Sequence, residues 1–203
     1  VQAGGGGAGD ATIVGGGQGR ALRLTGRGDL QLADAKGSGR PGGSFTVMAW
    51  ARLEENGGFL AANEVEGKGY WRLGHSPIGG GKWMFWLRNA EGETRHTAHR
   101  FTRRGRWRHV AGVYDGRTGR FRLYFNGRRI SRRADPTIKN LAAAGSPGLT
   151  VGRGAKGLID DVMFFDSALT GEEISALHGT QYSRYFGPRR ARVIKVTNLN
   201  PEG

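Results

Sequence analysis

The segment from Val110 to Gly127 most constrains what this chain can fold into, because it combines alternating apolar residues with tight-turn signals. Phe121, Leu123 and Phe125 alternate with basic or polar residues, and Asn126-Gly127 follows at once. Asn-Gly is the strongest short-range hairpin signal, because both central residues of a type I′ turn need positive φ. A second glycine-containing turn joins this run to the strand before it, so the sequence predicts an antiparallel meander.

The rest of the pattern is also typical of an all-β protein. Phe45–Leu53 alternates with period two, which predicts a half-buried strand, and similar short runs recur between turns. Glycine, with 38 of the 203 residues, suits many tight turns and disfavours long helices. The length favours one sizeable sandwich over two domains. Because cysteine is absent, disulfides and thiolate metal sites are excluded, and no apolar run approaches the ~18 residues that span a bilayer.

One short helix is predicted near the C-terminus. Thr170 and Glu173 form a capping box, and Ile174 and Leu177 lie three positions apart and make one apolar stripe. Gly179 is the expected end of this helix. We expect the helix to pack against the edge of the sandwich.

Both termini are predicted to extend beyond the sandwich. Residues 1–19 are rich in glycine and nearly without large apolar side chains, so they cannot order themselves. The sequence therefore predicts an N-terminal extension (1–19), a sandwich domain (20–179) and a basic C-terminal tail (180–203). The chain begins with Val1 and not with Met, which gives the expectation that a leader has been removed and that the protein is extracytoplasmic.

The positive charge of the chain is regional. The net charge is +14, and Arg100–Arg133 holds twelve arginines against one acidic residue, Asp115. Because Arg120 and Arg122 occupy alternate strand positions, the basic block is expected to form a patch on one sheet surface or its rim. Such a field attracts acidic polysaccharide, nucleic acid, lipid headgroups or an acidic protein face, whereas the alternative is a solvated surface that keeps the protein soluble. The candidate anion-binding or glycan-binding residues are Arg103, Arg104, Arg106, Arg120, Arg122, Arg128, Arg129, Arg132 and Arg133.

A series of short motifs, taken in order, resembles the laminin G-like, concanavalin A-like jelly-roll family. The motifs are Phe45–Trp50, Trp107–Val110, Tyr124–Gly127, Leu149–Gly152, Gly157–Val162 and Leu169–Ile174. The resemblance covers roughly Ala21 to Leu177. It implies an all-β, two-sheet antiparallel jelly-roll sandwich with one short C-terminal helix and extended termini. Family members bind sugars or proteins, so we expect a recognition module and not an enzyme.

The resemblance also implies a candidate structural calcium site. Several family members hold calcium near the first and last strands, and the positions that match are Asp29, Asp160 and Asp161. Calcium requires several converging oxygen ligands. The alternative is that Asp160 and Asp161 cap turns or pair with arginine. No other cofactor is expected.

The sequence predicts no catalytic site. Glycoside hydrolases of this fold need two carboxylates that face one cleft, about 5 to 5.5 Å apart in retaining enzymes. Glu54 and Glu55 are adjacent, and the pairs Glu64 with Glu66 and Glu91 with Glu93 lie in predicted turns, where solvated acids are expected. His109 lies in a strand motif where a packed imidazole is expected. Most aromatic residues among the arginines occupy core positions, so nucleic acid is not the expected partner.

Two functional hypotheses follow from the sequence. In the first, the chain is a non-catalytic accessory or scaffold subunit that docks on a larger extracytoplasmic protein assembly through its jelly roll and its basic tail. The tail would pair with acidic residues or lipid phosphates and supply aromatic anchors. In the second, the chain is a carbohydrate-binding module for acidic polysaccharide that uses the arginines named above. The candidate partner-binding residues of the tail are Arg184, Tyr185, Phe186, Arg189, Arg190, Arg192 and Lys195.

Overall fold

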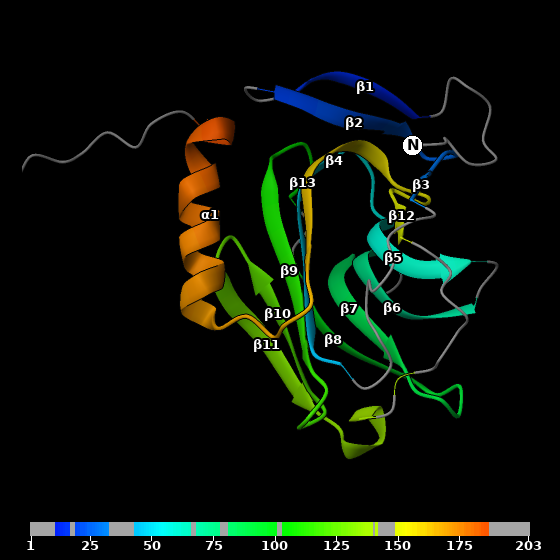
Figure 1. The fold of residues 1–203 in the computed structure, drawn as a ribbon. Coiled ribbons are helices and arrows are strands. Elements are labelled where there is room, and N and C mark those ends of the chain that lie inside the picture. Colours follow the sequence, from blue (N-terminus) through cyan, green and yellow to red (C-terminus); the bar gives the residue numbers. More distant parts are fainter. Residues whose placement is uncertain are drawn as a thin grey trace, which may run out of the picture.

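The computed structural model describes residues 11–16, 19–32, 43–65, 68–77, 81–100, 103–139, 141 and 149–186. Within these residues the chain forms the predicted sandwich of two antiparallel sheets with one helix (Figure 1). One sheet has seven strands in the order β1-β2-β13-β4-β9-β10-β11, and the other has six in the order β3-β12-β5-β6-β7-β8. The elements are β1 (Ala11–Gly16), β2 (Gly19–Thr25), β3 (Leu30–Leu32), β4 (Phe45–Leu53), β5 (Phe59–Val65), β6 (Lys68–Ser76), β7 (Lys82–Arg88), β8 (Thr94–Arg100), β9 (Arg108–Asp115), β10 (Arg120–Phe125), β11 (Arg128–Ala134), the 3₁₀ helix η1 (Pro136–Lys139), β12 (Leu149–Val151), β13 (Lys156–Phe165) and α1 (Gly171–Phe186).

The predicted meander is present as strands β9, β10 and β11. The β10–β11 turn has positive φ at both central residues, 49° at Asn126 and 74° at Gly127, as a type I′ turn requires. The Asn126 side-chain carbonyl also accepts a hydrogen bond from the His109 backbone N–H at 3.1 Å. This contact fixes the hairpin against β9, so the local turn signal and the tertiary structure agree.

The core lies between the two sheets and is rich in aromatic rings. Phe45 contacts Trp71, Phe85 and Tyr114 with ring centroids 5.4 to 6.0 Å apart. The Tyr114 hydroxyl donates a hydrogen bond to a backbone carbonyl of η1, so its polar atom is satisfied in the core. Gly112 lets β9 approach the facing sheet closely, because a Cβ at this position would lie 2.6 Å from the Phe85 ring.

Strand β4 is buried on both faces, whereas its period-two pattern predicts a half-buried strand. Met48 and Trp50 alternate with the core residues and yet have no accessible surface. Helix α1 covers them, because it lies along the outer face of the seven-stranded sheet (Figure 1). The expectation that the helix packs against the edge of the sandwich is therefore wrong.

Helix α1 begins as predicted and ends later than predicted. Thr170 and Glu173 form the capping box, in which the Glu173 N–H donates to the Thr170 hydroxyl at 3.2 Å and the Thr170 N–H donates to the Glu173 carboxylate at 2.7 Å. Gly179 does not end the helix, which continues to Phe186. A glycine inside a helix costs about 1 kcal/mol relative to alanine. Contacts beyond it offset this cost, including a 3.0 Å hydrogen bond from the Trp50 indole to the Gln181 side chain.

The N-terminal segment also differs from the prediction of an extension that cannot order itself. Its residues Ala11–Gly16 form β1, which pairs along its whole length with β2. Backbone pairing to a neighbour supplies the order that its own side chains could not. The sheet therefore begins before residue 20 and the helix ends after residue 179. The remainder of the predicted extension, apart from Gly19, lies outside the described residues.

Candidate functional site

A β-bulge places arginines of β11 on a single face of the sheet. In the β10–β11 ladder, Arg132 pairs with Arg122, whereas Arg129 pairs with Tyr124. Ile130 is the extra residue between these two pairs, so Arg129 and Arg132, three positions apart, face the same side. That side is the outer face, because Tyr124 packs under helix α1.

Arg129 and Arg132 line one hollow on the outer face of β10 and β11, together with Arg120 and Arg122. Arg133 also lines this hollow, although its pairing with Phe121 places it on the other face of the strand. The hollow has a volume of about 500 Å³. Arg122 is half-buried and the other four arginines are exposed. Of these five arginines, only Arg133 has an ion pair with another described residue, and its guanidinium lies 3.8 Å from Asp135. The lining residues are Arg120, Arg122, Arg129, Arg132, Arg133 and Ala134.

The cross-strand pair of Arg122 and Arg132 is electrostatically unfavourable. Directly opposite residues of an antiparallel pair have Cβ atoms about 4.5–5.5 Å apart, and like charges at such positions destabilise the sheet. The described residues provide no carboxylate for either guanidinium. The fold therefore holds uncompensated positive charge at this place, and an external anion would relieve it.

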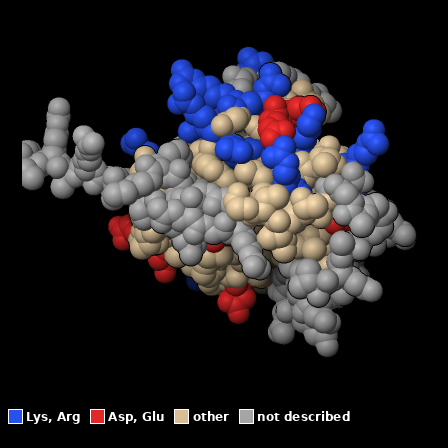
Figure 2. All heavy atoms as spheres, turned by 90° about the horizontal axis from the view of Figure 1, so that it is seen from above, with Lys and Arg blue, Asp and Glu red and all other residues tan. Residues whose placement is uncertain are grey.

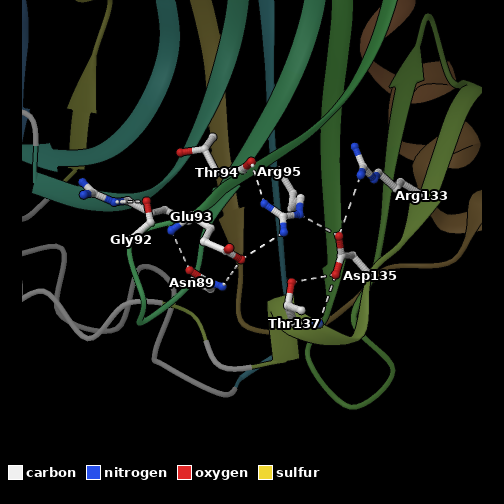
Figure 3. Close-up of polar contacts among 9 residues, drawn as sticks. Asn89, Gly92, Glu93, Thr94, Arg95, Arg133, Asp135 and Thr137 are labelled. Atoms are coloured by element: carbon white, nitrogen blue, oxygen red, sulfur yellow. Dashed lines mark hydrogen bonds and ion pairs between the residues drawn. The ribbon is translucent and has the colours of Figure 1, made fainter.

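An ionic network next to the hollow connects the two sheets (Figure 3). Arg95 on β8 donates a hydrogen bond to Asp135, just after β11, with an N···O distance of 2.8 Å, and also contacts Glu93 at 2.9 Å. Hydrogen bonds from Thr137, and then the contact with Arg95, hold the pKa of Asp135 below its usual value. Because Asp135 also pairs with Arg133, the network fixes the lower border of the hollow.

The other predicted arginines lie outside this hollow. Arg103, Arg104 and Arg106 are exposed on the loop between β8 and β9, and Arg128 is exposed at the start of β11. The structure adds Arg108, which was not among the candidates although it belongs to the same basic segment. Its guanidinium lies 5.8 Å from the centre of the Phe125 ring. Burial, and then the neighbouring charges of Arg106 and Arg103, lower the pKa of Arg108.

The three aspartates proposed for calcium do not form a group of ligands in the structure. Asp29 lies 3.7 Å from the Arg153 guanidinium. Asp160 accepts a hydrogen bond from the Asp161 backbone at 2.8 Å, and Asp161 has positive φ at an irregularity of β13. Over the described ranges, no three His, Cys, Asp or Glu side chains lie together as metal ligands. Calcium binding by these residues stays a prediction, with no geometry here that supports it.

The paired acids of the sequence are engaged at turns. Glu54 lies 3.4 Å from Arg23, Glu55 contacts Lys156 at 2.5 Å, and Glu93 contacts Arg95. These ion pairs use the carboxylates for surface contacts and not for a shared cleft. The side chains of Glu64 and Glu66, the remaining acidic pair, lie outside the described residues.

The predicted partner-binding tail is described only at its start. Arg184, Tyr185 and Phe186 belong to the last turn of α1. Arg189, Arg190, Arg192 and Lys195 lie outside the described residues. No helix in the described part is both long and apolar enough to cross a membrane.

A buried pair of histidines lies between α1 and the sheet. His109 has no accessible surface, and neither of its ring nitrogens has a hydrogen-bond partner among the described residues. His178 of α1 stacks on Trp50 with ring centroids 5.4 Å apart and lies 5.5 Å from the His109 ring. Burial, and then the nearby His178, lower the pKa of His109 to about 3. The expectation of a packed imidazole is confirmed, whereas its pairing with His178 has no sequence signal.

Comparisons with known proteins agree with the architecture. Residues 24–175 match a family model described as the Concanavalin A-like lectin/glucanases superfamily. No curated protein sequence matches the chain.

Several solved structures share the fold at low sequence identity. The binding domain of Paraclostridial Mosquitocidal Protein 1 aligns with a TM-score of 0.69 and 15% identity, over 85% of this chain and 46% of that one. The Botulinum neurotoxin serotype G binding domain aligns with a TM-score of 0.68 and 14% identity, over 85% of this chain and 47% of that one. A third structure is domain 4 of AbnA, a GH43 extracellular arabinanase from Geobacillus stearothermophilus, in complex with arabinotriose. It aligns with a TM-score of 0.61 and 22% identity, over 83% of this chain and 81% of that one. The chain thus spans less than half the length of the two toxin binding domains.

Proposed function

The chain belongs to the concanavalin A-like lectin/glucanase superfamily, and on this premise we propose that it is a non-catalytic binding module for an acidic polysaccharide. The ligand binds at the hollow of β10 and β11. The observation that carries this proposal is the set of five arginines that line one hollow of about 500 Å³, of which only Arg133 has a carboxylate partner in the described structure. An extracytoplasmic location belongs to the same proposal.

The chemistry of the hollow fits repeated anionic groups. Arginine presents five N–H donors in a planar fork that matches carboxylate and sulfate oxygens. The aromatic residues of the same strands are buried in the core or under α1, so they do not offer stacking platforms for nucleic acid bases. The site therefore suits a ligand recognised by its charge and hydrogen bonds.

The comparisons support a binding role without naming the ligand. Two of the neighbours are binding domains of toxins, and the third is a domain of an arabinanase solved with arabinotriose. The third neighbour shows that a sandwich of this shape, at 22% identity, takes a carbohydrate ligand. We infer the acidic character of the ligand from the arginines of this chain alone.

The accessory-subunit hypothesis is the second candidate. Helix α1 carries the chain to Phe186 on the outer face of the seven-stranded sheet, so the segment that follows begins next to this face. The tail residues would there be available for a protein partner in a larger assembly. This candidate predicts that removal of the residues after Phe186 abolishes assembly and leaves glycan binding intact.

A pair of double variants tests the polysaccharide proposal. The hollow variant, Arg122→Ser with Arg132→Ser, should bind heparin at least about tenfold more weakly, because each charge-assisted hydrogen bond contributes about 1.5–3 kcal/mol. The control, Arg27→Ser with Arg153→Ser, removes the same charge from turns that follow β2 and β12, strands that do not neighbour β10 or β11. Equal heparin affinity of the hollow variant and the control, at both low and physiological salt, would refute the proposal.

A further inference from the structure

We propose that the edge of β1 that faces away from β2 binds a second copy of this chain, so that two molecules pair their β1 strands antiparallel and join their seven-stranded sheets into one. This inference concerns a surface that the hollow does not use, and it does not depend on the ligand. Strand β1 ends the seven-stranded sheet, and β2 is its only neighbour in the described structure. An edge strand presents backbone N–H and C=O groups that can pair with another chain.

The other three edges of the described sandwich have features that prevent such pairing. Strand β3 has only three residues. The edge strands β8 and β11 carry arginines, and β11 also contains the bulge at Ile130. These two strands contact each other, since the Thr97 hydroxyl of β8 lies 2.5 Å from the Ser131 hydroxyl of β11. Short length, charge and bulges are the means by which natural proteins prevent association between sheet edges.

Strand β1 has none of these protective features. Its six residues, Ala11–Gly16, include no charged residue and no proline, and they pair with β2 without a register shift. This is an ordinary strand length. Arg23 of β2 lies opposite Thr12, but its charge is compensated by Glu54 at 3.4 Å. The edge is therefore regular, uncharged and long enough to pair.

An exposed isoleucine marks the same edge. Among the described side chains, Ile13 is the only large hydrophobic one that is exposed, at 69%. Ala11 packs against the core between the sheets, whereas Val14 packs with Trp50 on the outer face. Because alternate residues of a strand share a side, Ile13 faces the core side, and yet the described part of the six-stranded sheet leaves it uncovered. An apolar side chain in this position fits a partner that continues the sheet.

The sequence of β1 suits pairing with its own copy. A two-fold axis places the strand antiparallel to itself, so any charge on it would come close to the same charge. In the register with Ile13 opposite Ile13, Thr12 lies opposite Val14 and Ala11 lies opposite Gly15. Directly opposite side chains lie about 4.5–5.5 Å apart on the same face, where β-branched residues pack well. The two isoleucines therefore cover each other at the junction.

The location of β1 keeps the positive charges of two copies apart. Each chain carries a net charge of +14, so two copies repel each other unless they meet away from the arginines. Strands β1 and β11 lie at opposite ends of the seven-stranded sheet (Figure 1). At about 4.8 Å per strand spacing, this separation exceeds the ~8 Å over which charges act at physiological salt. Figure 2, which looks down on the end of the molecule where β1 lies, shows Lys and Arg side chains gathered along one side and not over the whole face.

Sedimentation velocity over a wide range of protein concentrations measures the self-association. Ile13→Lys places a charge at the centre of the edge, whereas Ala90→Lys adds the same charge to an exposed turn between β7 and β8. The unchanged protein and Ala90→Lys should form dimers with equal affinity. Ile13→Lys should associate at least about tenfold more weakly, because its dimer would bury two lysines in place of two isoleucines.

A single introduced cysteine tests the register. The chain contains no cysteine, so Ile13→Cys gives one thiol per molecule. In an antiparallel ladder, directly opposite Cα atoms are about 4.5–5.5 Å apart, which is within the range that a disulfide requires. Oxidation of Ile13→Cys should therefore give a covalent dimer on a non-reducing gel. The control Ala90→Cys should remain mostly monomeric under the same conditions.

Three results would overturn the proposal. The first is an unchanged protein that stays monomeric at every concentration, which would mean that a different partner or another segment of the chain occupies this edge. The second is an Ile13→Lys variant that dimerises like Ala90→Lys. The third is equal disulfide formation by the two cysteine variants. Because Ile13 is exposed in the single chain, all variants should keep the circular dichroism spectrum of the unchanged protein, which checks that they are folded.

Discussion

Lowering the pH should destabilise this protein through His109. The side chain has no accessible surface, and burial beneath α1 lowers its pKa to about 3. In the unfolded chain the same imidazole titrates near 6.5. The folded state therefore holds the neutral ring, and the contribution of this group to stability is fully present above pH 6.5. It is lost as the pH falls from about 6.5 toward 3, because the unfolded state takes up the proton first.

The size of this loss of stability follows from the difference between the folded and the unfolded pKa of His109. Each pH unit in this window removes about 1.4 kcal/mol from the free energy of unfolding. Between about pH 7.5 and pH 5 the expected loss is about 2 kcal/mol, and at about pH 4 it is about 3 kcal/mol. Such a loss is large beside the 5–15 kcal/mol of a typical domain. Helix α1 should loosen with it, since His109 contacts Trp50 and His178 at the helix interface.

Urea unfolding at about pH 7.5 and about pH 5, followed by tryptophan fluorescence, measures this loss of stability. The variants His109→Leu and His109→Gln keep the volume or the polarity of the side chain and cannot titrate. Both should show a smaller difference between the two pH values than the unchanged protein, by about 2 kcal/mol. The difference between proteins removes the contribution of the other titrating groups. If all three proteins lose the same free energy of unfolding, the account of His109 is wrong.

Three further predictions concern single side chains. Gly127→Ala should lower the free energy of unfolding by about 1–3 kcal/mol more than Gly105→Ala does. Both positions have positive φ, but only a Cβ at Gly127 would meet the His178 ring, at 2.9 Å. Equal melting temperatures of the two variants would contradict this. Gly112→Ala should lower the free energy of unfolding by at least about 1–3 kcal/mol, since its Cβ would lie 2.6 Å from the Phe85 ring of the facing sheet. A variant that unfolds at the same temperature as the unchanged protein would exclude such crowding. Arg122→Thr should raise the free energy of unfolding by about 0.2–1 kcal/mol at low salt and remove the thermal stabilisation by heparin; a loss of stability at low salt would show that like-charge repulsion is not the main effect.

The parts of the fold that the sequence predicts are those with local causes. The β10–β11 turn needs two residues that tolerate positive φ, and Asn126-Gly127 supplies both. The start of α1 needs two side chains three positions apart, and Thr170 with Glu173 supplies them. In each case the interacting groups are neighbours in the sequence, so a short pattern is sufficient.

The parts that the sequence misses depend on distant residues. Gly179 has the local signature of a helix end, but a hydrogen bond between Trp50 and Gln181, 131 positions apart, helps to hold the helix beyond it. Trp50 occupies a strand position that alternates with core residues, so the local pattern predicts exposure to solvent. It is buried because α1 covers it. Strand β1 is ordered by pairing with β2 and not by its own composition. Tertiary contacts override local propensity in all three cases.

The sequence predicts the residue type of the candidate site but not its layout. Arg120 and Arg122 alternate with core residues, which predicts their place on a sheet surface, whereas Arg103, Arg104 and Arg106 lie on the β8–β9 loop. That any of the nine arginines binds a ligand stays a prediction. Their division into a hollow and a loop depends on where β8 and β9 connect, which no short pattern specifies. The inclusion of Arg108 depends on its approach to Phe125 across the sheet.

The single extra residue at Ile130 decides which side of the sheet the charges of β11 face. In a strand that pairs regularly along its whole length, residues three positions apart lie on opposite sides, so without this bulge Arg129 and Arg132 would be separated by the sheet. Composition and overall charge would be unchanged, yet the side that now gathers positive charge would lose part of it to the interior. In relatives of this chain, the presence of this bulge should therefore matter more for ligand choice than the number of arginines in β11.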